Sequence, residues 1–235
     1  MITSLPPVRL KGDEFFGFVY HSQTPANLEK LDIPRKTVYR LSLYQRSLQK
    51  LIDQEVDTVS SEDLARAAGV KSTQLRKDLG HVGQFGTRGL GYSVATLSNA
   101  ISGVMGLTML QPVVMVGVGN LGSALLRYSG FRKEGFEIIA AFDAEPANVK
   151  ATTEQMGVPV YDVRDMGRYV SAHGVRMAII AVPESAGQGV ADILVKAGVQ
   201  AILNFSPTVL TVPDEVVVNH VDLAAELGSL SFFVS

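Results

Sequence analysis

The spacing of apolar positions changes along the chain and divides it into segments of different kinds. Apolar residues recur every three or four positions between residues 34 and 52, which predicts an amphipathic helix that Pro34 can begin. Two short helices should follow, one capped by Ser60 and ending at Gly69, the other over residues 72–79. Beyond residue 110, apolar runs alternate with helical stretches, as in a parallel sheet covered on both faces.

The short helices and the segment after them have the proportions of a winged helix-turn-helix, whose second helix enters the major groove of DNA. Segment 81–92 has glycines at 83, 86, 89 and 91 and places Arg88 near its tip. A slim ribbon carrying an arginine suits a wing that reaches a phosphate backbone or a narrow minor groove. A plain three-helix domain followed by an ordinary hairpin is the alternative.

The remaining elements predict a connecting helix and then a doubly wound sheet. The helix covers residues 93–105 and ends at Gly106. Strand candidates are 113–116, 138–142, 158–161, 177–182, 201–204 and 216–218, with helices near 121–129, 165–172 and 186–197.

The motif Gly117-Val118-Gly119-Asn120-Leu121-Gly122 joins the first of these strands to a helix and predicts a dinucleotide site. The three glycines allow a tight turn, a close approach of phosphates and close helix packing, and the N–H groups of the helix start face the anion. Asp143 ends the next strand 21 residues beyond Gly122, about the spacing of a ribose-binding acid. A carboxylate there favours NAD(H) over NADP(H), whose 2′-phosphate it would repel.

The charge of the chain is divided between its two parts. Residues 33–92 carry ten Lys and Arg against six Asp and Glu, whereas residues 93–235 carry eight against thirteen, within a total net charge of −2. A basic first block suits a polyanionic partner such as DNA.

The 235 residues include no cysteine, which excludes disulfides and thiolate metal sites, and we expect no metal. No apolar run of about 18 residues or export signal stands out, so we expect a cytoplasmic protein without a membrane partner. Residues 1–32, with aromatic residues between 15 and 20, receive no function.

With these pieces placed, residues 33–233 resemble the Rex family of redox-sensing transcriptional repressors. The residues that carry the resemblance are Arg40 to Arg46, Val59 to Leu64, Gln74 to Asp78, Gly86 to Tyr92, Gly117 to Gly122, Ala140 to Asp143, Ala181 to Pro183, Ile202 to Phe205 and Val221 to Leu223.

The resemblance implies roles for particular residues. The DNA-facing residues would be Thr73, Gln74, Arg76, Lys77, His81 and the wing arginine Arg88. A switch that responds to the nicotinamide would use Arg46, Tyr128 and Asp222, and the NAD(H) site would add Val182, Pro183, Asn204 and Tyr128 to Asp143 and residues 117–122. The chain departs from the family at His81-Val82, where members commonly carry an aromatic pair, and at Gly80, where they carry a serine.

Together these features predict an α/β protein with five segments and no enzyme activity. They are an extension (1–32), a winged-helix DNA-binding domain (33–92), a connecting helix (93–110), a Rossmann NAD(H)-binding domain (111–220) and a C-terminal dimerisation helix (221–235). The resemblance implies that this last helix is exchanged between the subunits of a homodimer, which would bind a palindromic operator in double-stranded DNA. The spacing of Leu223, Leu227 and Leu230 permits this exchange and an ordinary intrachain helix equally well.

Two other functions stay open. An NAD-dependent oxidoreductase needs an acid or base near the nicotinamide, and the candidates are His173, expected in a surface loop, and His220, expected to be structural. A Rossmann-like domain for coenzyme A or another nucleotide is the third reading, which Asp143 disfavours.

Overall fold

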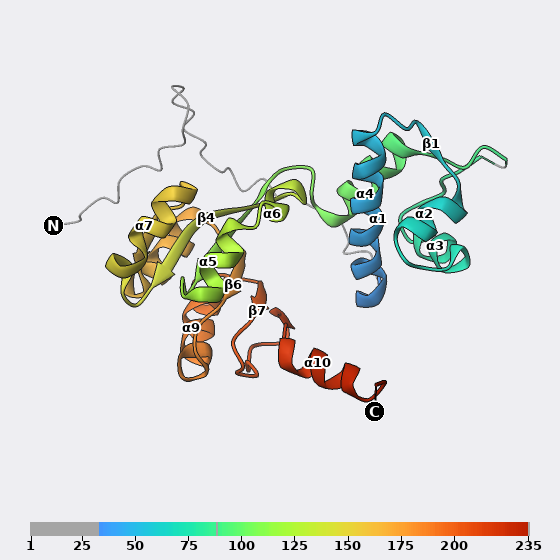
Figure 1. Ribbon diagram of the computed structural model, residues 1–235. Coiled ribbons are helices and arrows are strands. Elements are labelled where there is room, and N and C mark those ends of the chain that lie inside the picture. The colour runs from blue at the N-terminus through green and yellow to red at the C-terminus, as the bar shows by residue number, and fades with distance from the viewer. Residues whose placement is uncertain (1–32, 88, 235) are drawn as a thin grey trace, which may run out of the picture.

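A helical N-terminal domain and a C-terminal α/β domain make up the described part of the chain (Figure 1). The computed structural model describes residues 33–87 and 89–234, without the side chains of residues 151 and 152. Arg88 and the extension 1–32 therefore lie outside the described residues.

The N-terminal domain is a winged helix-turn-helix, as predicted. Its elements are α1 (Arg35–Asp53), β1 (Thr58–Val59), α2 (Ser61–Ala67), α3 (Ser72–Leu79), β2 (Tyr92–Ser93) and α4 (Val94–Met105). Ser60 caps α2 by accepting a hydrogen bond from the Asp63 N–H, and β1 pairs with β2 in antiparallel fashion. Between them, Thr87 and Gly91 exchange backbone hydrogen bonds at the base of the wing.

The helix expected to connect the domains is also part of the first hydrophobic core. Val94, Leu97 and Ile101 of α4 are fully buried beside Leu41 and Tyr44 of α1. Gly106 ends α4 in the left-handed conformation, and β3 begins five residues later at Gln111. The helix therefore ends where the sequence predicts, and residues 106–110 lead from it to β3.

The C-terminal domain contains a six-stranded parallel sheet of the order β5-β4-β3-β6-β7-β8. In chain order from β3 this is the 3-2-1-4-5-6 arrangement of dinucleotide-binding folds. The strands are β3 (Gln111–Val116), β4 (Phe136–Asp143), β5 (Val160–Asp162), β6 (Met177–Ile180), β7 (Ala201–Asn204) and β8 (Val217–His220). The helices and the 3₁₀ turn are α5 (Asn120–Arg127), α6 (Gly130–Lys133), α7 (Pro146–Met156), η1 (Val163–Asp165), α8 (Met166–His173), α9 (Glu184–Lys196) and α10 (Leu223–Ser231).

The two faces of the sheet are covered unequally. One face packs against α8 and α9 through a buried cluster that includes Tyr169 and Leu194. On the other face, α5 and α7 pack against each other and on the strands β3, β4 and β5, but the chain passes from β7 to β8 without a helix. An apolar groove of about 270 Å³ remains there, lined among others by Phe131, Met177 and Leu203.

The elements that the sequence analysis did not predict are the short strands β1 and β2, the helices α6 and α7, and η1. All six strand candidates and the three helices proposed between them are present, with ends shifted by a few residues. His173, expected in a loop, is the last residue of α8. α10 begins after the N-cap Asp222, and its residues are exposed along its length as it extends beyond the sheet (Figure 1).

Candidate dinucleotide and nucleic-acid sites

All of the predicted cofactor residues except Tyr128, which follows the last residue of α5, lie at the carboxyl end of the sheet. Residues 117–122 follow β3, Asp143 ends β4, Val182 and Pro183 follow β6, and Asn204 ends β7. β3 and β6 are neighbours, and the chain runs outward from them in opposite directions. This topological switch point is where open α/β sheets bind their ligands.

The fold itself requires glycine at positions 117 and 122, because a Cβ atom at either position would collide with a backbone carbonyl oxygen. Gly117 has a φ of +89°, and a Cβ there would lie 2.5 Å from the carbonyl oxygen of Ala181. A Cβ at Gly122 would lie 2.0 Å from the carbonyl oxygen of Gly117. A Cβ at Gly119 would meet no described protein atom within 4 Å, so the space beside it is open for a ligand.

Asp143 holds the glycine-rich turn as well as facing the crevice. Its Oδ2 accepts a hydrogen bond from the Val118 N–H at 2.8 Å, and its Oδ1 accepts one from the Glu145 N–H at 2.9 Å. An ionised carboxylate has about four acceptor positions, so two remain for ribose hydroxyls.

Asn204 is fully buried and shapes the loop that follows it. Its Oδ1 accepts from the Ser206 N–H at 3.0 Å, and its Nδ2 donates to the carbonyl oxygens of Ser206 and Thr208. Its Nδ2 also lies 3.0 Å from Nδ1 of His220. The side chain thus fixes the loop at the edge of the crevice, and direct contact with a cofactor stays a prediction.

A cavity of about 130 Å³ lies between the start of α5 and the start of α10. Leu121 lines it from the glycine-rich turn, Asp222 and Leu223 from the C-terminal helix, and Phe205 and Pro207 from the loop after β7. The predicted switch residue Asp222 therefore borders the same space as the predicted cofactor residue Leu121.

The predicted DNA-facing residues that the structure describes lie on α3 or just after it. Thr73, Arg76 and Lys77 are exposed, whereas Gln74 and His81 are half-buried. Nη1 of Arg76 donates to Oγ of Ser61 at 2.9 Å, which turns this side chain toward α2.

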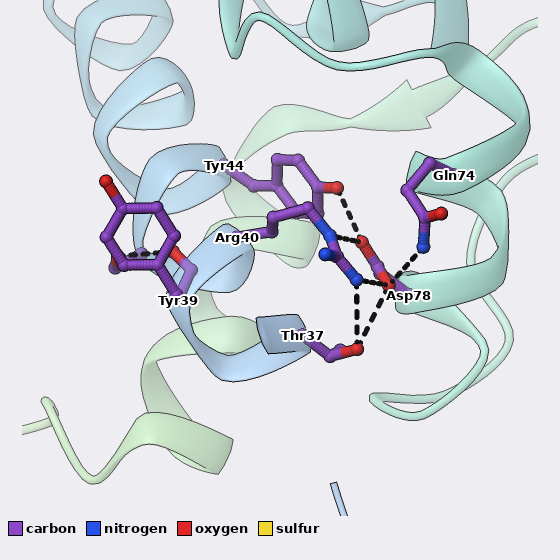
Figure 2. A network of polar contacts seen from close by, with 7 residues as sticks. Thr37, Tyr39, Arg40, Tyr44, Gln74 and Asp78 are labelled. Atoms are coloured by element: carbon purple, nitrogen blue, oxygen red, sulfur yellow. Dashed lines mark hydrogen bonds and ion pairs between the residues drawn. The ribbon is translucent and has the colours of Figure 1, made fainter. Parts of the chain in front are cut away.

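Asp78, the residue that anchors α3 to α1, was not predicted as a site residue. It is 1% exposed, and its carboxylate accepts five hydrogen bonds from four side chains (Figure 2). Oδ2 accepts from Arg40 Nε at 2.6 Å and Tyr44 Oη at 2.7 Å. Oδ1 accepts from Arg40 Nη2 at 2.7 Å, Gln74 Nε2 at 2.9 Å and Thr37 Oγ1 at 3.2 Å.

These contacts change the ionisation of the buried groups. Burial by itself would raise the pKa of the Asp78 carboxyl, but the hydrogen bonds from Arg40, Tyr44 and Gln74 outweigh it and hold the pKa at about 2. Burial and the hydrogen bond to this carboxylate raise the pKa of Tyr44. Asp78 is therefore an anion at neutral pH, and Arg40 compensates its charge.

The three predicted switch residues are not joined to one another by a hydrogen bond or ion pair within the described chain. Nε of Arg46 pairs instead with Oε1 of Glu134 at 2.9 Å, a contact between α1 and the end of α6 that sequence analysis missed. Tyr128 is 56% exposed, so it is not a core residue, and its ring packs edge-on against Phe131. Asp222 caps α10, since its Oδ1 accepts hydrogen bonds from the N–H groups of Ala224 and Ala225.

The candidate acid or base residues for an enzyme have structural contacts. The ring of His173 stacks on that of Tyr169 with centroids 3.9 Å apart, and its Nδ1 lies 2.9 Å from the Tyr169 carbonyl oxygen. Nδ1 of His220 lies within hydrogen-bonding distance of Nδ2 of Asn204. Among the described residues no group of three or more potential metal ligands gathers, and no helix is long and apolar enough to cross a membrane.

Two family models match the two domains. One described as "Putative DNA-binding protein N-terminus" matches residues 32–80, and one described as "CoA binding domain" matches residues 109–208. The first covers α1 to α3, and the second covers the sheet from β3 to β7.

Whole-chain relatives are similar over both domains. The redox-sensing transcriptional repressor Rex of Streptomyces avermitilis is 51% identical over 200 residues, which cover 85% of this chain and 79% of that protein. The protein of the same name from Desulforamulus reducens is 44% identical over 205 residues, which cover 87% of this chain and 97% of that protein.

Solved structures of RSP, a Rex-family repressor, share the fold. The complex of RSP with beta-NAD+ and operator DNA matches with a TM-score of 0.78 and 34% identity, covering 86% of this chain and 92% of that one. The complex with beta-NADH matches with a TM-score of 0.73 and 31% identity, covering 86% and 94%.

Proposed function

Because this chain belongs to the Rex family of redox-sensing transcriptional repressors, we propose that it binds operator DNA through α3 and the wing and is released when NADH replaces NAD+. Members of this family are repressors rather than enzymes. The observation that carries the proposal is that one molecule contains both α3, whose outer face is exposed, and a Rossmann crevice.

The residue assignments combine the family resemblance with the positions of the described side chains, and Arg88 is assigned from the sequence alone. Thr73, Gln74 and Lys77 would face the major groove, with Arg76 and His81 beside them and Arg88 on the wing. NAD(H) would lie on the turn 117–122, with Asp143 at the adenosine ribose and with Val182, Pro183 and the loop shaped by Asn204 near the nicotinamide. Asp222 would report the redox state, since it borders the cavity beside Leu121.

We infer that the repressor is a homodimer and that α10 of each subunit packs on the other. Leu223, Leu227 and Leu230 of α10 are 59%, 69% and 59% exposed, and the sheet face near β7 and β8 has an apolar groove. Two faces of this kind are stabilised by burying each other. A two-fold dimer would present two α3 helices to a palindromic operator, and the protein would act in the cytoplasm, where its DNA lies.

The domain arrangement of this chain supports a DNA-competent state. It overlaps better with the RSP complex that holds beta-NAD+ and operator DNA than with the one that holds beta-NADH. NADH would shift the population toward another arrangement only to the extent that it binds that arrangement more tightly.

The proposal is tested by titrating NADH and NAD+ separately into the protein bound to a labelled operator fragment, at one stated salt concentration. Fluorescence anisotropy should fall at a much lower concentration of NADH than of NAD+. Operator binding that is indifferent to both nucleotides would contradict the redox-sensing part, and no binding to a fragment known to contain the operator would contradict the DNA-binding part.

Coenzyme A and a panel of carbonyl substrates serve as controls for the other functions. The match to a CoA-binding family model makes coenzyme A a necessary competitor. Its adenosine carries a 3′-phosphate, which the Asp143 carboxylate would repel, so it should not displace NADH. Oxidation of NADH by a carbonyl compound would favour an oxidoreductase.

The role of Asp222 is best tested with asparagine. Asp222→Ala would remove the N-cap of α10 at a cost of about 1 kcal/mol, which mixes a structural effect with the loss of charge. Asp222→Asn keeps a good capping side chain and removes the charge. It should blunt release by NADH while leaving operator binding without NADH intact, and an unchanged NADH response would remove Asp222 from the switch.

A further inference from the structure

The amide of Gln74 joins the buried network around Asp78 to the outer face of α3. Its Nε2 donates to Oδ1 of Asp78 at 2.9 Å, within one helical turn. Gln74 is half-buried, while Thr73 and Lys77 beside it are exposed. The side chain therefore has one end in the domain and the other at the surface that would face DNA.

The contact with Asp78 determines which end of the Gln74 amide, the NH₂ group or the oxygen, faces the buried network. The two ends of a glutamine amide are similar in size, and its orientation must usually be inferred from its partners. An ionised carboxylate only accepts hydrogen bonds, so the NH₂ group must face Asp78. Figure 2 shows the oxygen of Gln74 pointing away from the network.

The anion that orients Gln74 is itself held rigidly. Arg40 donates two hydrogen bonds to Asp78, and Tyr44 and Thr37 donate one each, all from α1. Arg40 also compensates the charge, so the network adds little repulsion toward phosphates. Gln74 thus presents an oxygen acceptor from a fixed position on α3.

We propose that Gln74 determines operator specificity by accepting a hydrogen bond from an exocyclic amino group in the major groove, and that Asp78 is the residue that positions it. The N4 amino group of cytosine and the N6 amino group of adenine are donors there. Guanine O6 and N7 and thymine O4 are acceptors and would face the Gln74 oxygen unfavourably. The inference rests on the proposed function, since it assigns a base class to the same interface.

The experiment begins with an operator that the wild-type protein selects from random duplexes. Each base pair of the half-site is then exchanged for the other three, symmetrically in both halves, and the affinity is measured by anisotropy at one salt concentration. Wild-type protein should prefer cytosine or adenine over guanine or thymine by about tenfold or more at the position that Gln74 reads.

Gln74→Met keeps the length of the side chain and removes the amide. It should abolish the preference at that one position while leaving the other positions and the salt dependence unchanged, because phosphate contacts remain. Gln49→Met is the matched control, since Gln49 makes the same kind of contact with Asp53 on α1, Nε2 to Oδ1 at 3.1 Å. The control should change no preference.

A distinct set of results would overturn the proposal. If Gln74→Met leaves every preference intact, or if the position it affects favours guanine or thymine, Gln74 is not the acceptor we infer, although specific binding by wild type would still support the proposed function. If wild type selects no operator, both fail. A preference for adenine over cytosine would indicate a further hydrogen bond, donated by the second N–H of Gln74 to adenine N7.

The positioning role of Asp78 has its own readout. In Asp78→Asn the new amide can offer either end to Gln74, so the distinction between base classes should relax at that position only. A uniform loss of affinity at all positions would mean a purely structural role. If this variant does not fold, the Gln74 amide protons of wild type, assigned from Gln74→Met, should exchange more slowly than those of exposed Gln155, and equal exchange would contradict the contact.

Discussion

The carboxyl group of Asp78 makes the N-terminal domain sensitive to acid. Its pKa of about 2 in the folded protein lies below the ordinary value of 3.8, which the unfolded chain regains. Its hydrogen bonds therefore stabilise the domain fully above about pH 4, and this stabilisation, about 2 kcal/mol, is lost as the pH falls through 2.

Urea unfolding of wild type and Asp78→Asn at pH 6 and near pH 2.5 tests this directly. At pH 6 the variant should be less stable by about 3 kcal/mol, because Arg40 loses its anionic partner, and the gap should shrink in acid. A gap of equal size at both pH values would contradict the assigned ionisation. Asp162→Asn is the control, since Asp162 pairs with Arg164 at the surface and solvent screens that pair.

Gly119 is a position at which a substitution should weaken ligand binding without destabilising the fold. Because a Cβ there meets no described atom within 4 Å, Gly119→Ala should change stability by no more than about 0.5 kcal/mol. The same methyl group would crowd a pyrophosphate and weaken NADH binding about tenfold or more, a loss of at least about 1.4 kcal/mol. Gly122→Ala, whose Cβ would meet the Gly117 carbonyl, should lose stability as well. For both variants, titration calorimetry measures the NADH affinity and thermal unfolding measures the stability.

At the scale of elements, strong periodicity decided what the sequence predicts. The predicted helix 72–79 agrees with α3, and the apolar runs gave the parallel strands. α7 was missed because its side chains are mostly polar and small, with Val149 and Met156 as its larger apolar residues, and α6 is a single turn. The Arg46–Glu134 pair joins residues 88 apart in sequence, so no local pattern could reveal it.

The C-terminal helix supplies a prediction about assembly. Leu227 lies on α10 and is 69% exposed, so a charge there should do little to the folded monomer. If α10 packs on the partner, Leu227→Asp buries a charge and should dissociate the dimer, with a large loss of operator affinity. Analytical ultracentrifugation measures the first effect. Ile193→Asp, on α9 at the opposite face of the sheet, is the control and should stay dimeric.

At the scale of the whole molecule, the Arg46–Glu134 pair links the DNA-binding helices to the cofactor domain. Glu134 ends the single turn α6, which begins two residues after Tyr128. The segment that carries the predicted switch residue Tyr128 therefore also forms an ion pair with the predicted switch residue Arg46. Because the described arrangement is the one that we propose binds DNA, the ion pair should stabilise the DNA-bound state. It competes with any other carboxylate, Asp222 included, for the same guanidinium.

Glu134→Gln should therefore make the repressor more sensitive to NADH. A partly exposed ion pair contributes about 0.2–1 kcal/mol, so the NADH concentration for half release should fall about 1.4-fold to 5-fold, while NADH affinity without DNA stays nearly constant. Glu137→Gln, which breaks a neighbouring pair with Arg132 inside the Rossmann domain, should leave the half-release concentration unchanged. If both variants behave alike, or if Glu134→Gln makes release harder, Glu134 does not hold the DNA-bound arrangement.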